Sequence, residues 1–167
     1  EEPAGTRVID VPSGSGVFLL GLAPESRIEY TAVDISEEML ARVRAAAEEK
    51  GLTNVSTLSA DATKLPIPDG SFDLVLTYNG LHCFNEPWTA LREFRRILTD
   101  DGRIRGTILL RRPTLVAPRV QSYFQFRGLL GPIGTWAEVQ TWFAAAGLRV
   151  RRVRQSGALA FFEGKAA

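Results

Sequence analysis

Short apolar runs alternate along the chain with longer segments in which apolar residues recur every three or four positions. The short runs predict buried strands, and the longer segments predict amphipathic helices. The expected strands are Val8–Val11, Ile28–Asp34, Val55–Ser59, Phe72–Thr77 and Ile104–Leu110. Strands that alternate with helices predict a Rossmann-like, doubly wound α/β fold, with a mostly parallel sheet covered by helices on both faces.

Several residues mark where the expected helices begin. Ser36 can cap the helix after the second strand, and Pro87 suits the first turn of a helix after the fourth strand. Thr135 and Glu138 have the spacing of a capping box. A helix is also expected from Val17, directly after the first strand and its loop of small residues.

The C-terminal part of the chain is less regular. Asp101-Gly102 is expected to turn the chain into the fifth strand, and Leu148–Val153 and Ala158–Glu163 predict a closing antiparallel hairpin, which brings the sheet to seven strands. Residues 111–134 contain prolines, arginines and aromatic residues but no acidic residue, which predicts an irregular basic insertion over the pocket. The composition of this segment is compatible with four roles: a segment that covers the substrate pocket, a contact with an anionic membrane, an RNA-binding patch, or a solvated surface without a ligand.

Composition bounds the class of protein. The 167 residues suit one domain, 1–167, and the formal net charge of +1 gives no reason to expect a nucleic-acid partner. Cys83 is the only cysteine, which excludes an internal disulfide and fits a reducing, cytoplasmic compartment. No apolar run approaches the ~20 residues that span a bilayer. The first strand begins almost at once, so we expect that N-terminal residues of the domain are missing.

Candidate chemistry gathers where the expected strands end. The first strand leads into Asp10-Val11-Pro12-Ser13-Gly14-Ser15-Gly16, and glycines at 14 and 16 let a ligand approach the backbone closely. Asp34 ends the second strand, where a carboxylate can accept from both hydroxyls of a ribose. Asp61 follows the third strand and Tyr78-Asn79 the fourth. Ligands of such sheets bind at the carboxyl ends of the strands. No cluster of residues has metal-ligand spacing, so no metal is expected.

In this order the motifs resemble a known family. The chain looks like a class I S-adenosylmethionine (SAM)-dependent methyltransferase of the small-molecule type (methyltransferase domain 11 group), from about Thr6 to about Glu163. The matching segments are Asp10–Gly16, Val33–Ser36, Ala60–Ala62, Asp69–Val75 and Leu98–Ile104. Pro12 stands where the family usually has its first glycine, which removes a backbone N–H and fixes φ.

The resemblance implies a cofactor, SAM, its product S-adenosylhomocysteine, and a set of contacts. Asp10 would lie near the methionine amino group, and Pro12, Ser13, Gly14 and Gly16 would form the loop on which the methionine part packs. Asp34 would bind the ribose. Ile35 and Met39 would flank the adenine, while Asp61 and Ala62 would frame it at the exocyclic amine. Tyr78 and Asn79 would lie beside the methyl-bearing end. Because transfer depends on holding the reactants in line, a catalytic residue is optional.

Each assignment has a plainer alternative. Asp10 and Asp61 could cap turns, Asp34 could be only a helix N-terminal charge, and Met39 could be plain core. His82 is the only histidine and the candidate catalytic base, although we favour a role in packing against substrate or cofactor over a role as a base. For the neighbouring Cys83 we expect a buried, small apolar role.

Two other functions remain open. A nicotinamide-dependent oxidoreductase would need a third glycine where Leu19 stands. A non-catalytic SAM-fold module that acts through protein contacts is compatible with the sequence. For a methyltransferase, the composition of 111–134 favours a hydrophobic or anionic small-molecule acceptor, and it leaves the accepting atom and the oligomeric state open.

Overall fold

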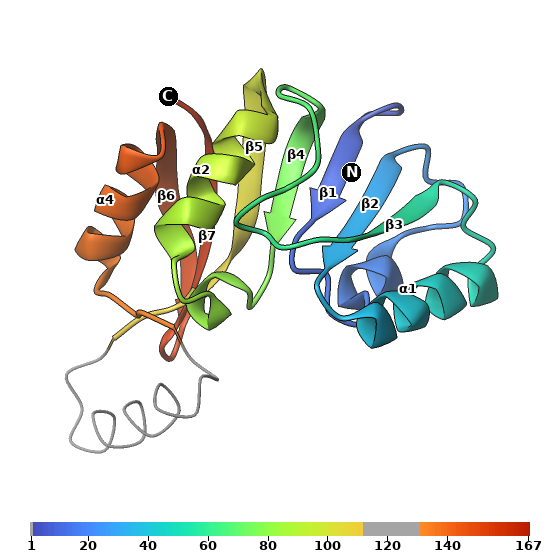
Figure 1. The fold of residues 1–167 in the computed structure, drawn as a ribbon, viewed down its shortest axis with the longest axis horizontal. Helices are drawn as coiled ribbons and strands as arrows, with labels where there is room; N and C mark the ends of the chain where they lie inside the picture. The colour runs from blue at the N-terminus through green and yellow to red at the C-terminus, as the bar shows by residue number, and fades with distance from the viewer. Residues whose placement is uncertain (1, 112–130) are drawn as a thin grey trace.

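The computed structural model describes residues 2–111 and 131–167, which form one seven-stranded sheet flanked by helices (Figure 1). The strand order is β3-β2-β1-β4-β5-β7-β6, and β7 runs antiparallel to both of its neighbours. The strands are β1 Arg7–Asp10, β2 Glu29–Asp34, β3 Val55–Ser59, β4 Phe72–Thr77, β5 Leu98–Leu109, β6 Leu148–Ser156 and β7 Leu159–Ala166. The helices are α1 Glu37–Glu49, α2 Pro87–Ile97 and α4 Trp136–Ala145, with short 3₁₀ helices η1 Val17–Gly21 and η2 Leu81–Cys83.

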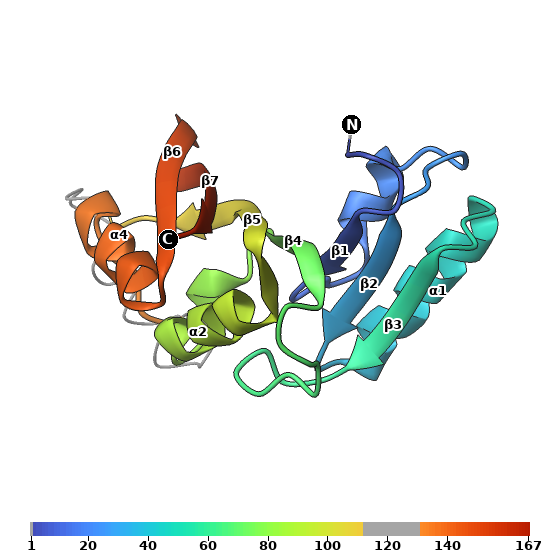
Figure 2. The ribbon, with the colours of Figure 1, turned by 90° about the horizontal axis from the view of Figure 1, so that it is seen from above.

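The alternation of side chains along the strands builds two hydrophobic cores, one on each face of the sheet. Val8 of β1 and Leu74 of β4 belong to the core under α1 and η1. Their neighbours Ile9 and Val75 belong to the core under α2 and α4. Figures 1 and 2 show α2 and α4 together over the β5–β7–β6 half, and α1 beside the β1–β2–β3 half. The expected doubly wound fold with an antiparallel C-terminal strand is therefore confirmed.

The local signals for helix starts are also confirmed. The Ser36 hydroxyl accepts from the Met39 amide, and α2 begins at Pro87. At α4, Thr135 accepts from the Glu138 amide while the Glu138 carboxylate accepts from the Thr135 amide, which is the expected reciprocal box. These signals could be predicted because each acts within one turn of the helix that it begins.

Two expectations were wrong in detail. The segment after the glycine loop is not an α-helix but the five-residue 3₁₀ helix η1, so it presents little helix dipole to a ligand. The expected turn at Asp101-Gly102 lies inside β5. Phe72 of β4 is paired with Leu98 of β5, but Leu74 is paired with Arg103. The segment of β5 between these pairs is therefore longer than that of β4, and its extra residues form a bulge.

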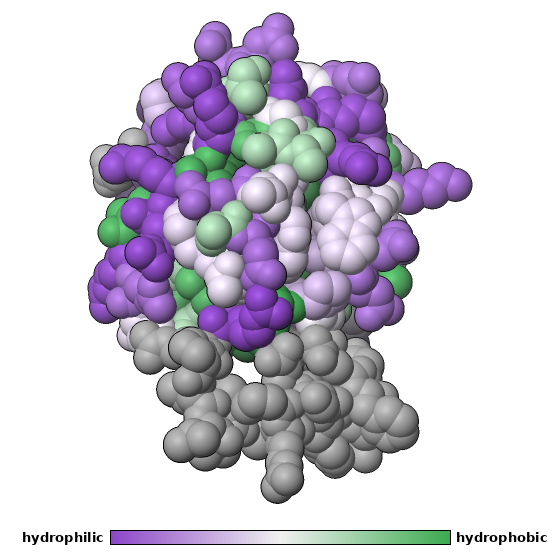
Figure 3. Space-filling model, turned by 90° about the vertical axis from the view of Figure 1, so that its left-hand side faces the viewer, coloured by the Kyte–Doolittle hydropathy of each residue, from purple (hydrophilic) through white to green (hydrophobic). Residues whose placement is uncertain are grey.

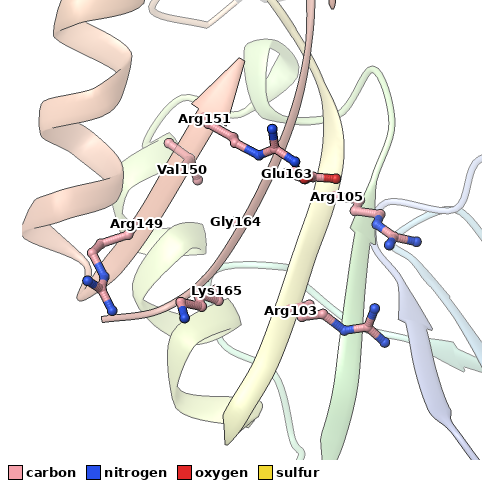
Figure 4. Close-up of a pocket in the computed structure, with 8 residues that line it drawn as sticks. All are labelled: Arg103, Arg105, Arg149, Val150, Arg151, Glu163, Gly164 and Lys165. Atoms are coloured by element: carbon pink, nitrogen blue, oxygen red, sulfur yellow. Dashed lines mark hydrogen bonds and ion pairs between the residues drawn. The ribbon is translucent and has the colours of Figure 1, made fainter. Parts of the chain in front are cut away.

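The face of β5, β7 and β6 that is turned away from α2 and α4 is basic (Figure 4). It carries Arg103, Arg105, Arg149, Arg151, Glu163 and Lys165 around a hollow of about 560 Å³. Glu2 accepts from both Arg103 and Arg105, and Arg151 pairs with Glu163. Figure 3 views the molecule from the side on which β6 and α4 lie, and the surface on this side is mainly hydrophilic. Charged side chains on an edge strand oppose pairing with another sheet.

Among the described helices, none has the length and apolar composition needed to cross a membrane. Most of the predicted insertion, residues 112–130, lies outside the described residues, and Arg111 at its start pairs with Glu138.

The capping box of α4 gives a direct test of the fold. Replacing Thr135 by Ala leaves the Glu138 amide without its side-chain acceptor and should lower the free energy of unfolding by ~0.5–2 kcal/mol in urea denaturation. Thr141→Ala is the matched control, because Thr141 is an exposed residue of the same helix and, in the described structure, donates only to the Glu138 carbonyl. An equal loss in both variants would contradict the capping role of Thr135.

Candidate active site

Parallel pairing of β1 with both β2 and β4 brings three strand ends to one point on the edge of the sheet. A cavity of about 680 Å³ opens there. Its lining contains seven of the residues expected from the sequence, Asp10, Pro12, Ser13, Gly14, Asp34, Tyr78 and Asn79, together with Ser15, Val17, Phe18 and Gly21, which the sequence did not single out.

The two glycines of the loop have different roles. Both have a positive φ, +52° at Gly14 and +80° at Gly16. A Cβ on Gly14, which lines the cavity, would meet nothing within 4 Å, whereas one on Gly16 would lie 3.1 Å from Val43 of α1. Gly14 therefore leaves open space beside the cavity lining, and Gly16 lets the loop pack on α1.

Pro12, where the family usually has glycine, is accommodated by a residue far away in the sequence. A Cβ on Gly80 would come within 2.1 Å of the Pro12 ring. The loop keeps its attachments to the sheet, since the Val11 amide donates to Leu76 and the Ser13 amide to Val33. The proline is thus compatible with the loop because residue 80 has no side chain.

Both carboxylate oxygens of Asp34 accept a hydrogen bond from a backbone amide. One accepts from the Gly14 amide and the other from the Ser36 amide, each at 2.9 Å. Each oxygen retains a second lone pair for a ligand hydroxyl. Asp34 therefore holds the glycine loop and faces the cavity at the same time.

Asp10 is a buried acid with a single neutral donor in the described structure. The Tyr30 hydroxyl donates to its Oδ2 at 2.5 Å. Burial raises the pKa of Asp10, the bond from Tyr30 lowers it, and the charge of Asp34 raises it, so that together they bring the pKa to about 7. Near neutral pH, Asp10 is therefore divided between its protonated and ionised forms.

Tyr78 and Asn79, which follow β4, also line the cavity. The Asn79 amide donates to the Thr107 hydroxyl at 2.9 Å, and that hydroxyl donates to the Asn79 side chain at 3.0 Å. Phe18 of η1 stacks on Tyr78, with ring centroids 6.3 Å apart. Two hydroxyls at this edge, those of Ser13 and Thr77, are buried and have no hydrogen-bond partner among the described residues.

The remaining expected contacts lie outside this cavity. Ile35 is 76% exposed and Met39 is half-buried, while Ala62 is part of the α2-side core. Asp61 accepts from the amide and the hydroxyl of Thr63, at 2.8 and 2.7 Å, so it does form the turn cap considered as its plainer alternative. That bonding lowers the pKa of Asp61 and leaves its second oxygen available.

His82 and Cys83 lie in η2, beyond the cavity lining. The Nδ1 of His82 accepts from the Leu109 amide at 3.4 Å, and burial lowers the pKa of the imidazole, so its neutral form is favoured. Cys83 is exposed, and the expectation that it is buried was wrong. The short 3₁₀ turn places it at the surface, although its neighbour Leu81 points into the core.

The fold and this edge site together define a class of protein. The methyltransferase domain family matches residues 9–105, and the chain belongs to it. It is a class I SAM-dependent methyltransferase domain, as its motifs indicated, and SAM is the cofactor of this class.

Particular relatives are similar over much of the chain. The uncharacterized methyltransferase YcgJ of Bacillus subtilis (strain 168) is 37% identical over 97 residues, 58% of this chain and 38% of the relative. The demethylmenaquinone methyltransferase of Geobacillus stearothermophilus is 33% identical over 134 residues, 78% of this chain and 56% of the relative. The crystal structure of YcgJ has a TM-score of 0.84 and covers 99% of this chain and 94% of that one, at 20% identity, which shows a shared fold. The matches cover between about four tenths and just over half of these two curated relatives' lengths.

The raised pKa of Asp10 makes the stability of the ligand-free protein depend on pH. Between about pH 4 and pH 7 the folded state holds a proton that the unfolded state has lost, so this stabilisation is complete at low pH and is lost as pH rises. Asp10→Asn removes the titration. The stability of the parent relative to the variant should fall by about 1.4 kcal/mol per pH unit across this window in urea titrations.

Asp73→Asn is the matched control, because Arg7 lowers the pKa of Asp73 and so moves its titration to more acidic pH. Its stability difference from the parent should stay constant from about pH 5 to pH 8. A flat difference for Asp10→Asn as well would contradict the protonated state of Asp10.

Proposed function

We propose that the cavity at the ends of β1, β2 and β4 is the SAM site of this domain, and that the complete protein transfers the methyl group of SAM to a small-molecule acceptor. One observation carries the proposal: the cavity has an open glycine floor and two carboxylates, and no lysine, arginine or histidine among its described lining residues. Such a site favours a positively charged ligand.

The available polar groups fit the chemical groups of SAM. Asp10 faces the cavity with a carboxyl group that can pair with an ammonium. Asp34 keeps lone pairs for the two ribose hydroxyls, and the buried Ser13 hydroxyl lacks a partner in the described structure. Gly14 leaves room for the methionine part above the loop. We assign these roles to Asp10, Ser13, Gly14 and Asp34, and we place the methyl-bearing end beside Tyr78 and Asn79.

The same features disfavour a dinucleotide. A pyrophosphate is stabilised by the N-terminus of an α-helix, and here the loop is followed by a 3₁₀ helix of only five residues. Two carboxylates in the cavity would also repel its negative charge. These observations support SAM over NAD or NADP as the ligand of this domain.

When bound, SAM supplies a methyl group on a positively charged sulfur, which needs little further activation. The residues of this chain then act by orientation, which is worth ~7–11 kcal/mol when reactants are held in line. Asp34 and the loop fix one end of the ligand, and Tyr78 is placed by its stacking on Phe18. His82 lies outside the cavity lining, and burial lowers its pKa, so we assign it a packing role and no role as an obligatory base.

A hydrophobic acceptor is supported by one relative and by sequence composition. The Geobacillus relative is named as a methyltransferase of demethylmenaquinone. In the present chain, residues 111–134 supply aromatic residues and arginines without any acid. We therefore propose a hydrophobic or anionic small molecule as the acceptor.

Replacement of Asp34 tests the assignment of the cavity. Asp34→Ala should weaken SAM binding roughly tenfold to a hundredfold in calorimetric titration, because hydrogen bonds to a charged group are worth ~1.5–3 kcal/mol. Glu38→Ala is the control, since this exposed carboxylate of α1 pairs only with Arg42 in the described structure. Unchanged affinity in Asp34→Ala, or tight binding of NAD by the parent, would refute the proposed site.

The role of His82 is tested separately. His82→Ala should leave methyl transfer to an accepted substrate within about tenfold of the parent, since a general base contributes ~10²–10⁴-fold. The measurement is the turnover rate at saturating SAM together with the SAM affinity. A larger loss of rate with unchanged affinity would make His82 the base.

A further inference from the structure

A buried tyrosine that no motif indicated is joined to the cavity by its hydroxyl and by its ring. Tyr30 of β2 is 1% exposed, and its hydroxyl donates to Asp10 at 2.5 Å. Its ring stacks on Phe18 at 5.9 Å with an interplanar angle of 3°, and Phe18 lines the cavity. Tyr30 therefore contacts both the acidic and the aromatic part of the cavity wall from behind.

We infer that Tyr30 is a positioning residue for SAM: its hydroxyl holds the Asp10 carboxyl at the cavity, and the Tyr30–Asp10 pair releases one proton when the ammonium group of the methionine end binds. This inference rests on the proposed function. In the balanced step, the Asp10 carboxylic acid loses its proton to solvent and becomes the carboxylate that pairs with the ammonium.

The surroundings of Asp10 explain why a proton is present before the ligand binds. The charged or titratable groups that act on it are Tyr30 beside it on β2 and Asp34 at the end of the same strand. Tyr78, after β4, also senses the charge of Asp10, together with that of Arg105 on β5. No cation is among the groups that shift the pKa of Asp10 in the described structure, so burial and Asp34 both favour the neutral acid.

An arriving ammonium reverses this balance, because an opposite charge within a few ångströms favours the ionised form. The hydroxyl of Tyr30 assists, since a donor to a carboxylate stabilises the charged state. Tyr30 thus keeps the pKa of Asp10 low enough for ionisation near neutral pH. Without this hydroxyl, ionisation would require a higher pH.

The first experiment uses the parent protein. SAM affinity should rise about twentyfold between roughly pH 5.5 and pH 7.5, and calorimetry in two buffers of different ionisation enthalpy should show nearly one proton released at the lower pH. The amino group of the ligand itself titrates near ~8, which sets the upper limit of the window. 5′-Methylthioadenosine, which lacks the amino group, should bind with the same affinity across the window.

The second experiment uses Tyr30→Phe, which keeps the stacked ring and removes the hydroxyl. Its SAM affinity at about pH 7 should fall severalfold, and its pH profile should move to higher pH because the pKa of Asp10 rises. Thr31→Val is the matched control: it removes a hydroxyl from the next residue of β2, where the partner is the exposed Ser56. Its affinity and pH profile should match those of the parent.

The outcomes separate the inference from the proposed function. SAM binding by the parent with no proton release and no pH dependence would overturn the inference and leave the SAM site standing. An equal loss of affinity at every pH in Tyr30→Phe would also overturn it, because that result describes a packing role. Failure of the parent to bind SAM at any pH would overturn the proposed function on which the inference rests. If Tyr30→Phe does not fold, the parent measurements and a flat profile in Asp10→Asn still decide.

Discussion

Parallel hydrogen bonding of β1 to β2 on one side and to β4 on the other is the constraint on which the rest of the molecule depends. This pairing brings Asp10, Asp34 and Tyr78 to one edge, although they are far apart in the sequence. It also fixes which face each side chain takes, so that Val8 and Ile9 enter different cores. A register shift of one residue would exchange these faces and bury a different set of side chains.

The site that results is acidic, and its two carboxyl groups have different hydrogen-bond donors. Asp34 accepts hydrogen bonds from two backbone amides, those of Gly14 and Ser36, which hold its carboxylate in place. Asp10 is buried with the neutral donor Tyr30, and its pKa rises to about 7. One acid of the cavity is therefore a fixed part of the loop, while the other has a protonation state that depends on what occupies the cavity.

Local features of the fold were predictable from the sequence, and features set by distant contacts were not. Ser36, Pro87 and the pair Thr135–Glu138 act within one helical turn, so short spacings sufficed to place them. The bulge in β5 appears only in its pairing with β4, which lies far from it in the sequence. The role of Tyr30 could not be predicted, because its partner Asp10 lies on the neighbouring strand. In the register of these two strands Tyr30 is paired with Val8, and Asp10 lies two residues further along β1. The edge position of the site was predictable, since it follows from the order of strands and helices.

The departure at Pro12 shows why a motif has to be interpreted together with its packing partners. In the sequence alone, the proline in place of the usual glycine is a departure that removes a backbone N–H and fixes φ. In the folded chain the proline ring occupies space that is free because residue 80 is glycine, and the amides of Val11 and Ser13 still bind the flanking strands. The loop therefore keeps its attachment to the sheet, and Gly14 remains open to the cavity. The loop thus keeps its backbone conformation and the open space at Gly14 although proline replaces the usual glycine. This replacement is possible because Gly80, which follows the adjacent strand β4, has no side chain that would meet the proline ring.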